Sequence, residues 1–348
     1  MYYSLIMPLG IVTSFESMSI GFFINIIVAF NGIIMCLIFL PKIKLMYLSN
    51  NLIYFLIIIL SGIYIYTYVM LIATGGLTRI NFNLEEVYDV REQLSQNRFF
   101  LSSYFINWVG YSLNPLLIIL GLYKKRGSLL LTGIIMQLLI FSMTNFKSFL
   151  YIIILLIVVY YLAQKPKLFS KIGIAVFVFL SVMYIHYLTF GVTVLNSSLI
   201  RRQFFIPAHL HFLYHDFFSR NYNPFIYFSD SILSSVVNYP YQDAVTRVIS
   251  KFYWGREFGP NVGFFGNAYF NIGIPGVYLL SILLVLLLKI VQSTEKHLPS
   301  KVISALILTP FMALINSGFF TTLLTHSFLL TIITLWIISS YEKNKKMR

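Results

Sequence analysis

The sequence predicts an all-α protein, a polytopic transmembrane helix bundle of about 9–10 spans, with one large loop outside the membrane that contains short interfacial helices. Composition is the first reason. Of the 348 residues, 58% are hydrophobic and 10% are charged, whereas a soluble domain carries about 25% charged residues. The second reason is that the apolar residues fall in runs of about 20, the length that an α-helix needs to cross a bilayer. Such a chain is expected to use the membrane as its solvent.

Nine apolar runs are predicted to cross the membrane. The stretch 127–164 is too long for one helix, and the polar tetrapeptide Asn145–Ser148 divides it into a hairpin. The predicted spans are 18–40, 51–74, 99–123, 127–144, 148–164, 174–192, 269–290, 302–320 and 322–340. Residues 1–17 are also apolar, and they are expected either to cross as a tenth span or to lie at the interface. The chain is therefore predicted to form a single integral membrane domain, 1–348.

Lysine marks one side of the predicted bundle. If the spans alternate in direction, the lysine-rich segments all fall on the same side: 41–50, 124–126, 163–173, 291–301 and the tail 341–348. Short loops rich in Lys and Arg stay in the cytoplasm, so the C-terminus is predicted to be cytoplasmic. Two longer segments lie on the opposite side, a first loop over 75–98 and a large loop over 193–268. The large loop is dense in aromatic residues, so it is expected to pack.

Arginine marks the opposite, outer side. Only two lysines join the arginines there, and the outer cations are Arg79, Arg91, Arg98, Lys147, Arg201, Arg202, Arg220, Arg247, Lys251 and Arg256. The planar guanidinium binds two phosphate oxygens at once, so this pattern predicts an outward-facing site for a phosphate-bearing substrate. The candidate ligands of a diphosphate are Arg201, Arg202, Arg91, Arg247, Arg256 and Lys147. For any single arginine the alternative is snorkelling or contact with lipid headgroups, but the adjacent pair Arg201 and Arg202 favours substrate binding.

Two histidines of the large loop are candidate bases. His211 and His215 lie four residues apart, so they share one face of a helix, and histidine titrates near neutral pH. The alternative is a structural role, in which both are polar residues of an interfacial helix. The same spacing suits a metal ion, but no His-Glu-x-x-His pattern is present and the one cysteine, Cys36, lies in an apolar run. No metal site is therefore predicted.

Four short patterns resemble one membrane-protein family. Val87–Arg91 resembles a tyrosine-plus-arginine motif before the third span, and Asn145–Ser148 resembles a Gly/Asn-x-Lys-Ser hairpin. Arg202–Ala208 resembles the start of a large periplasmic loop, and Pro260–Gly263 resembles its end. With these patterns the chain resembles the O-antigen polymerase family, the Wzy-type oligosaccharide repeat-unit polymerases. An Arg-x10-Gly motif of some members is absent from this sequence.

The resemblance implies a metal-independent glycosyltransferase without a cofactor. Such enzymes lie in the bacterial inner membrane and transfer a glycan from undecaprenyl diphosphate to a sugar hydroxyl on the next lipid-linked repeat unit. The outer arginines would hold the diphosphate, with Arg202 favoured over Arg201 by its family-like spacing. One of His211, His215, Asp216 or Glu257 would activate the hydroxyl. The implied sugar contacts are Tyr88, Tyr214, Asn261 and Asn267. The implied partners are the lipid-linked oligosaccharide itself and a chain-length regulator and a flippase of the same pathway.

Two other functions stay open at this stage. An O-antigen ligase shares the layout and the donor, but its acceptor is lipid A–core. A flippase or other transporter of lipid-linked oligosaccharides belongs to a different class, and it is expected to show repeat symmetry and charged residues near the membrane midplane. The charges of this chain gather at one face and a single outer loop dominates, so the transporter is the less favoured of the two.

Overall fold

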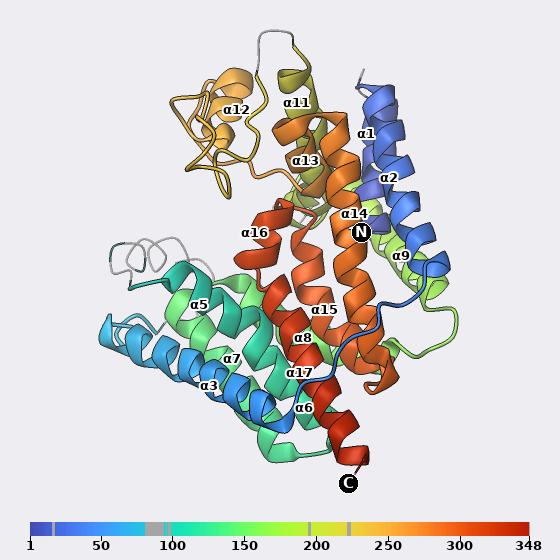
Figure 1. Ribbon diagram of the computed structural model, residues 1–348. Coiled ribbons are helices and arrows are strands. Elements are labelled where there is room, and N and C mark those ends of the chain that lie inside the picture. The colour runs from blue at the N-terminus through green and yellow to red at the C-terminus, as the bar shows by residue number, and fades with distance from the viewer. Residues whose placement is uncertain are drawn as a thin grey trace. The chain divides into compact units, whose positions relative to one another are not determined.

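The computed structural model describes residues 1–15, 18–80, 94, 96, 99–193, 196–220 and 224–347. These residues form helices, turns and coil, and no strand occurs among them (Figure 1). The chain divides into two compact units, each built from three stretches of sequence. Unit 1 consists of Met1–Pro41, Lys167–Leu288 and Met312–Thr321, and unit 2 consists of Lys42–Pro166, Lys289–Phe311 and Thr322–Arg348.

Within the described residues, six helical runs are long and apolar enough to cross a membrane, which confirms the predicted polytopic helix bundle. They are α2 (Ile20–Phe39), α3 (Asn50–Ala73), the run Ser102–Tyr123, α7 (Gly127–Thr144), α9 (Leu168–Phe190) and the run Ile274–Lys296. The run Ser102–Tyr123 comprises α5 (Ser102–Trp108), the wide π-helical turn η2 (Val109–Leu113) and α6 (Asn114–Tyr123). The described part of the chain also contains shorter apolar helical runs, namely Tyr2–Ser14, Lys147–Leu162 (α8) and Ser300–Ala313 (α15).

Unit 1 is built around α11 (Ile206–Ser219), which belongs to the predicted large loop. The π-helical segment η3 (Ser197–Phe205) runs directly into it. α11 packs against the N-terminal helix α1 (Met7–Phe15) and against α13 (Phe264–Ile272), and α11 and α13 lie side by side in Figure 1. Eight of its residues are buried, mostly aromatic and aliphatic ones. The aromatic density of the loop therefore makes a packed core, as its composition predicts.

A second short helix of the loop has an interfacial character. α12 (Val245–Trp254) buries Val245 and Ile249 on one face, whereas Arg247 and Lys251 are exposed. Its C-terminal end exposes the large apolar side chains of Phe252 and Trp254. A helix with one apolar face and a basic polar face is suited to the membrane surface.

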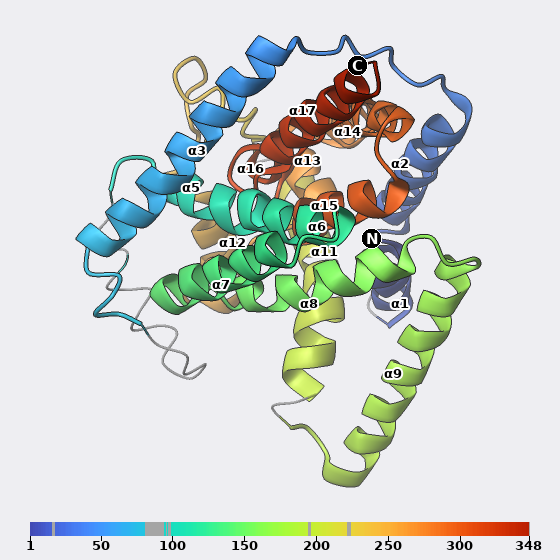
Figure 2. The ribbon, with the colours of Figure 1, turned by 90° about the horizontal axis from the view of Figure 1, so that it is seen from below.

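Unit 2 contains three closely packed helices, α6, α7 and α8 (Figure 2). Glycine permits the close approach of α6 and α7, because a Cβ on Gly121 would come within 2.4 Å of the Leu130 amide nitrogen. Buried Gln137 joins the same helices to η2, since its Nε2 donates to the carbonyl of Gly110 at 3.1 Å and of Phe149 at 2.9 Å.

The helix boundaries differ from the prediction in the C-terminal third. The predicted spans 302–320 and 322–340 are instead α15, the short α16 (Phe319–Leu324) and α17 (Phe328–Lys346). α15 ends early because the turn after it packs on the start of α13, where the Phe264 amide donates to the Leu314 carbonyl at 2.8 Å. The predicted span 269–290 is likewise broken between α13 and α14 (Ile274–Ser293) at Gly273, whose φ of 73° is left-handed.

Candidate functional site

A groove of about 570 Å³ lies on unit 1 between α1, the η3–α11 run and the segment after α12. Its lining residues are Ile11, Val12, Arg201, Phe205, Ile206, His209, Leu210, Leu213, Trp254, Phe258 and Pro260. Most of this surface is aliphatic or aromatic, and it carries one guanidinium and one imidazole. A ligand that matches it has an extended apolar part and an anionic part.

The helical run places the two polar groups on the same face. Arg201, Phe205, His209 and Leu213 follow one another at intervals of four residues and all line the groove, as expected for one stripe of a helix. Pro207 lies where η3 passes into α11, and its missing N–H removes one backbone hydrogen bond from the run at this junction. Arg202 is also exposed, but it does not line the groove.

An aromatic pair forms another part of the groove wall. The rings of Trp254 and Phe258 are 5.1 Å apart, and the two side chains are 42% and 45% exposed. Gly255, with a left-handed φ of 61°, ends α12 between them. The Phe258 amide donates to the Ser250 hydroxyl at 3.3 Å, so the chain folds back on α12 and both rings remain available to a ligand.

Lys251 forms ion pairs with two carboxylates beside the turn that follows α12. Lys251 Nζ lies 2.7 Å from an Asp243 carboxylate oxygen and 3.0 Å from a Glu257 carboxylate oxygen. These hydrogen bonds raise the pKa of the Lys251 ammonium and lower that of Asp243. Glu257, one of the predicted bases, is therefore exposed and ion-paired at the rim of the α12 turn.

Asp216, another predicted base, joins α11 to α12. Its Oδ2 accepts a hydrogen bond from Arg220 at 2.7 Å and another from the Tyr253 hydroxyl, which also contacts the Leu213 carbonyl at 3.1 Å. Burial by itself would raise the pKa of the Asp216 carboxyl, but the hydrogen bonds from Arg220 and Tyr253 outweigh it and hold the pKa below its usual value. The group is thus an ionised tether between the two helices.

His215 lies in an aromatic sandwich. Its ring stacks on Phe22 at 4.4 Å and lies 4.7 Å from Tyr269. Burial lowers the pKa of the imidazole, and the nearby Asp216 carboxylate only partly opposes that shift. His215 is therefore neutral at physiological pH, the protonation state that a general base needs, but it does not line the groove.

His211 is fully buried inside unit 1. Its Nδ1 contacts the Pro207 carbonyl at 2.6 Å, and because a carbonyl only accepts, Nδ1 carries the proton. Nε2 then holds the lone pair and has no hydrogen-bond partner among the described residues. Burial lowers the pKa of His211 to about 4. Since its ring lies against Gly266 of α13, this histidine is part of the helix packing.

The predicted sugar and diphosphate contacts are dispersed. Tyr214 is buried and its hydroxyl donates to the Pro260 carbonyl at 2.8 Å. Asn261 is exposed, and the side chain of Asn267 fills the space beside Gly318. Among the cations, Arg247 in α12 and Arg256 just after it are exposed without lining the groove, and Lys147 begins α8 of unit 2. Tyr88 and Arg91 lie outside the described residues.

The groove adds residues that the sequence analysis missed. His209, Trp254 and Phe258 were not candidates, although the intervals of four residues from Arg201 to Phe205 and from Phe205 to His209 were visible in the sequence. In the described part of the chain, no three His, Cys, Asp or Glu side chains lie close enough to hold a metal ion. Comparisons with models of protein families, with curated proteins and with solved structures found no match.

Proposed function

We propose that this protein polymerises undecaprenyl-diphosphate-linked oligosaccharide repeat units at the periplasmic face of the bacterial inner membrane, in the synthesis of O-antigen or capsule polysaccharide. The groove on unit 1 carries the proposal. Its aliphatic and aromatic walls suit an isoprenoid chain, and Arg201 suits the diphosphate that joins the chain to the glycan. The arginine-rich outer segments and the family-like motifs of the sequence support the same substrate.

The proposed reaction is a metal-independent glycosyl transfer. The bond between the donor sugar C1 and the diphosphate oxygen breaks, and a bond forms between C1 and an acceptor hydroxyl oxygen. Arg201 stabilises the negative charge of the leaving diphosphate, at roughly 1.5–3 kcal/mol for a charge-assisted contact. His209 lies roughly 10–12 Å from Arg201 along the same face, which leaves room for a sugar between them, and it takes the proton of the acceptor hydroxyl.

Reconstitution separates the candidate activities. The purified protein in vesicles, supplied with undecaprenyl-diphosphate-linked repeat units, is expected to produce a ladder of longer lipid-linked glycans with release of undecaprenyl diphosphate. The products are resolved on gels and by mass spectrometry. Transfer of glycan only to added lipid A–core would identify a ligase instead. Movement of the intact donor across the vesicle membrane without any transfer would identify a flippase.

The orientation of the chain is a separate prediction. The lysine-rich segments are expected to lie in the cytoplasm, together with the C-terminus, and residues 193–268 in the periplasm. Alkaline phosphatase fused after Asp230 should be active, because the enzyme needs the oxidising periplasm, whereas a fusion after Lys345 should be inactive. A cytoplasmic fluorescent reporter at the same two positions is the control and should give the opposite pattern. Active phosphatase only at Lys345 would reject the outward-facing site.

A further inference from the structure

We propose that unit 2 binds one anionic phospholipid, with an acyl chain in a pocket between α3, α6 and α17 and the headgroup at the basic ends of these helices. This site is independent of the groove on unit 1 and of the proposed reaction. The pocket has a volume of about 460 Å³. Its lining residues are Ile57, Leu60, Ser61, Tyr64, Ile65, Leu113, Leu116, Leu117, Leu120, Thr334, Ile337 and Ile338.

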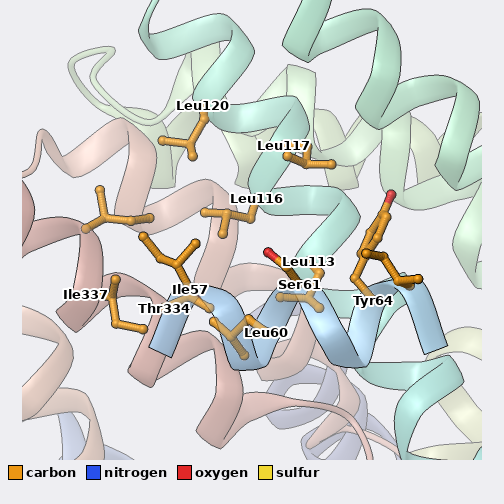
Figure 3. A pocket seen from close by; sticks show the side chains of 12 residues that line it. Ile57, Leu60, Ser61, Tyr64, Leu113, Leu116, Leu117, Leu120, Thr334 and Ile337 are labelled. Atoms are coloured by element: carbon orange, nitrogen blue, oxygen red, sulfur yellow. The ribbon is translucent and has the colours of Figure 1, made fainter. Parts of the chain in front are cut away.

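The pocket wall is mostly aliphatic, which suits a hydrocarbon chain. Nine of its twelve residues are leucine or isoleucine, and Figure 3 shows the leucines of α6 on one side and the side chains of α3 on the other. Two of the three hydroxyls already have partners in the protein. Tyr64 donates to the Asn114 side chain at 2.8 Å, and Thr334 donates to the Thr331 carbonyl at 2.9 Å. A polar ligand would therefore lose its hydration here without equivalent hydrogen bonds.

The pocket opens to the lipid-exposed surface of α3. Two of its lining residues, Ile57 and Ile65, are 42% and 62% exposed, and α3 is one of the helices long and apolar enough to span the membrane. At that depth the surrounding solvent is the acyl chains of the bilayer. An acyl chain can therefore enter from the side, without crossing water.

The charges near one end of the pocket select the headgroup. Leu120 precedes Lys124 by four residues, and Ile338 precedes Lys345 by seven, so the pocket begins roughly 6–10 Å from the basic helix ends. In the lysine-rich segments the acidic residues are Glu295 and Glu342. Both are already paired, with Lys42 and Lys124 respectively.

Several cations at this end are consequently unneutralised. They are exposed and have no carboxylate partner within the described ranges, namely Lys125, Arg126, Lys345 and Lys346. Each basic residue near a membrane surface contributes about 1 kcal/mol of attraction to anionic lipid. A phospholipid with an anionic headgroup matches both the unneutralised cations and the apolar pocket. A phospholipid with a zwitterionic headgroup matches only the pocket.

Native mass spectrometry of the full-length protein tests the site. After delipidation, the protein is titrated with phosphatidylglycerol or with phosphatidylcholine of the same acyl chains. One phosphatidylglycerol is expected to bind at least about tenfold more tightly than phosphatidylcholine, the ratio given by about 1.4 kcal/mol. Equal binding of the two lipids would overturn the headgroup assignment, and displacement of phosphatidylglycerol by a polyprenyl phosphate would overturn the choice of occupant.

Variants separate the pocket from general lipid adhesion. Leu116→Trp and Ser61→Phe fill the pocket from α6 and α3, and each is expected to lower retention of phosphatidylglycerol severalfold. Leu131→Trp is the matched control, because Leu131 is 59% exposed on α7 and does not line the pocket. The thermal midpoint of each variant establishes that it is folded. Folded pocket variants that keep the lipid as well as the Leu131→Trp control would overturn the proposal.

Discussion

Replacing Arg201 with alanine is expected to abolish long-chain glycan while the amount of protein in the membrane stays near the wild-type level. The side chain is exposed and lines the groove, so its loss removes a ligand contact without leaving a cavity in a core. If the guanidinium stabilises the leaving diphosphate, the loss should appear in the rate of transfer. The measurement is glycan ladder length on a gel, paired with an immunoblot for the protein.

Arg201→Lys distinguishes substrate binding from anchoring at the membrane surface. Lysine keeps the charge but loses the bidentate geometry, so a phosphate-binding arginine should be poorly replaced by it. An arginine that only snorkels should be replaced without effect, since lysine snorkels equally well. A lysine variant with ladders clearly shorter than wild type is therefore the expected result.

The neighbouring arginine provides the matched control. Arg202 has the same side chain and is also exposed, but it lies outside the groove. Arg202→Ala is expected to retain most of the ladder, although the family-like spacing in the sequence favoured this residue. Full ladders from both Arg201 variants would remove Arg201 from the mechanism. Loss of the ladder in Arg202→Ala alone would transfer the diphosphate-binding role to Arg202.

The sequence predicted those features that depend on the membrane as solvent. Apolar runs of sufficient length identified the helical architecture, because an unpaired backbone cannot remain in hydrocarbon. The polar tetrapeptide at Asn145 correctly divided α7 from α8, and Asn145 indeed has a left-handed φ of 53° at this turn. Loop packing was also predictable, since so many aromatic residues cannot all face water.

Tertiary contacts decided what the sequence could not predict. The spacing of His211 and His215 correctly put both on one helix, but only the fold shows that one is buried and the other stacked on aromatic rings. Hydropathy carried the predicted span past the end of α15 because Leu314 and Ile315, which begin the turn, are apolar. The groove depends on α1, which is distant in sequence from Trp254, and neither composition nor spacing brings such segments together.

Gly263→Ala is expected to reduce the folded protein strongly. An added Cβ would lie 2.1 Å from the carbonyl oxygen of Ile315 and 2.8 Å from that of Leu314. Neither carbonyl belongs to a flexible side chain, and the Leu314 carbonyl is held by the amide of Phe264. The backbone of unit 1 must therefore shift. Overpacking typically costs about 1–3 kcal/mol and occasionally more, against a total stability of about 5–15 kcal/mol.

Gly259→Ala is the matched control in the same segment. Its added Cβ would meet only the Thr246 hydroxyl at 3.8 Å, an ordinary contact, and Gly259 is exposed. Thermal unfolding followed by size-exclusion chromatography in detergent should show a midpoint several degrees lower for Gly263→Ala and unchanged for Gly259→Ala. Equal midpoints for the two variants would mean that the turn after α15 does not rest on Gly263.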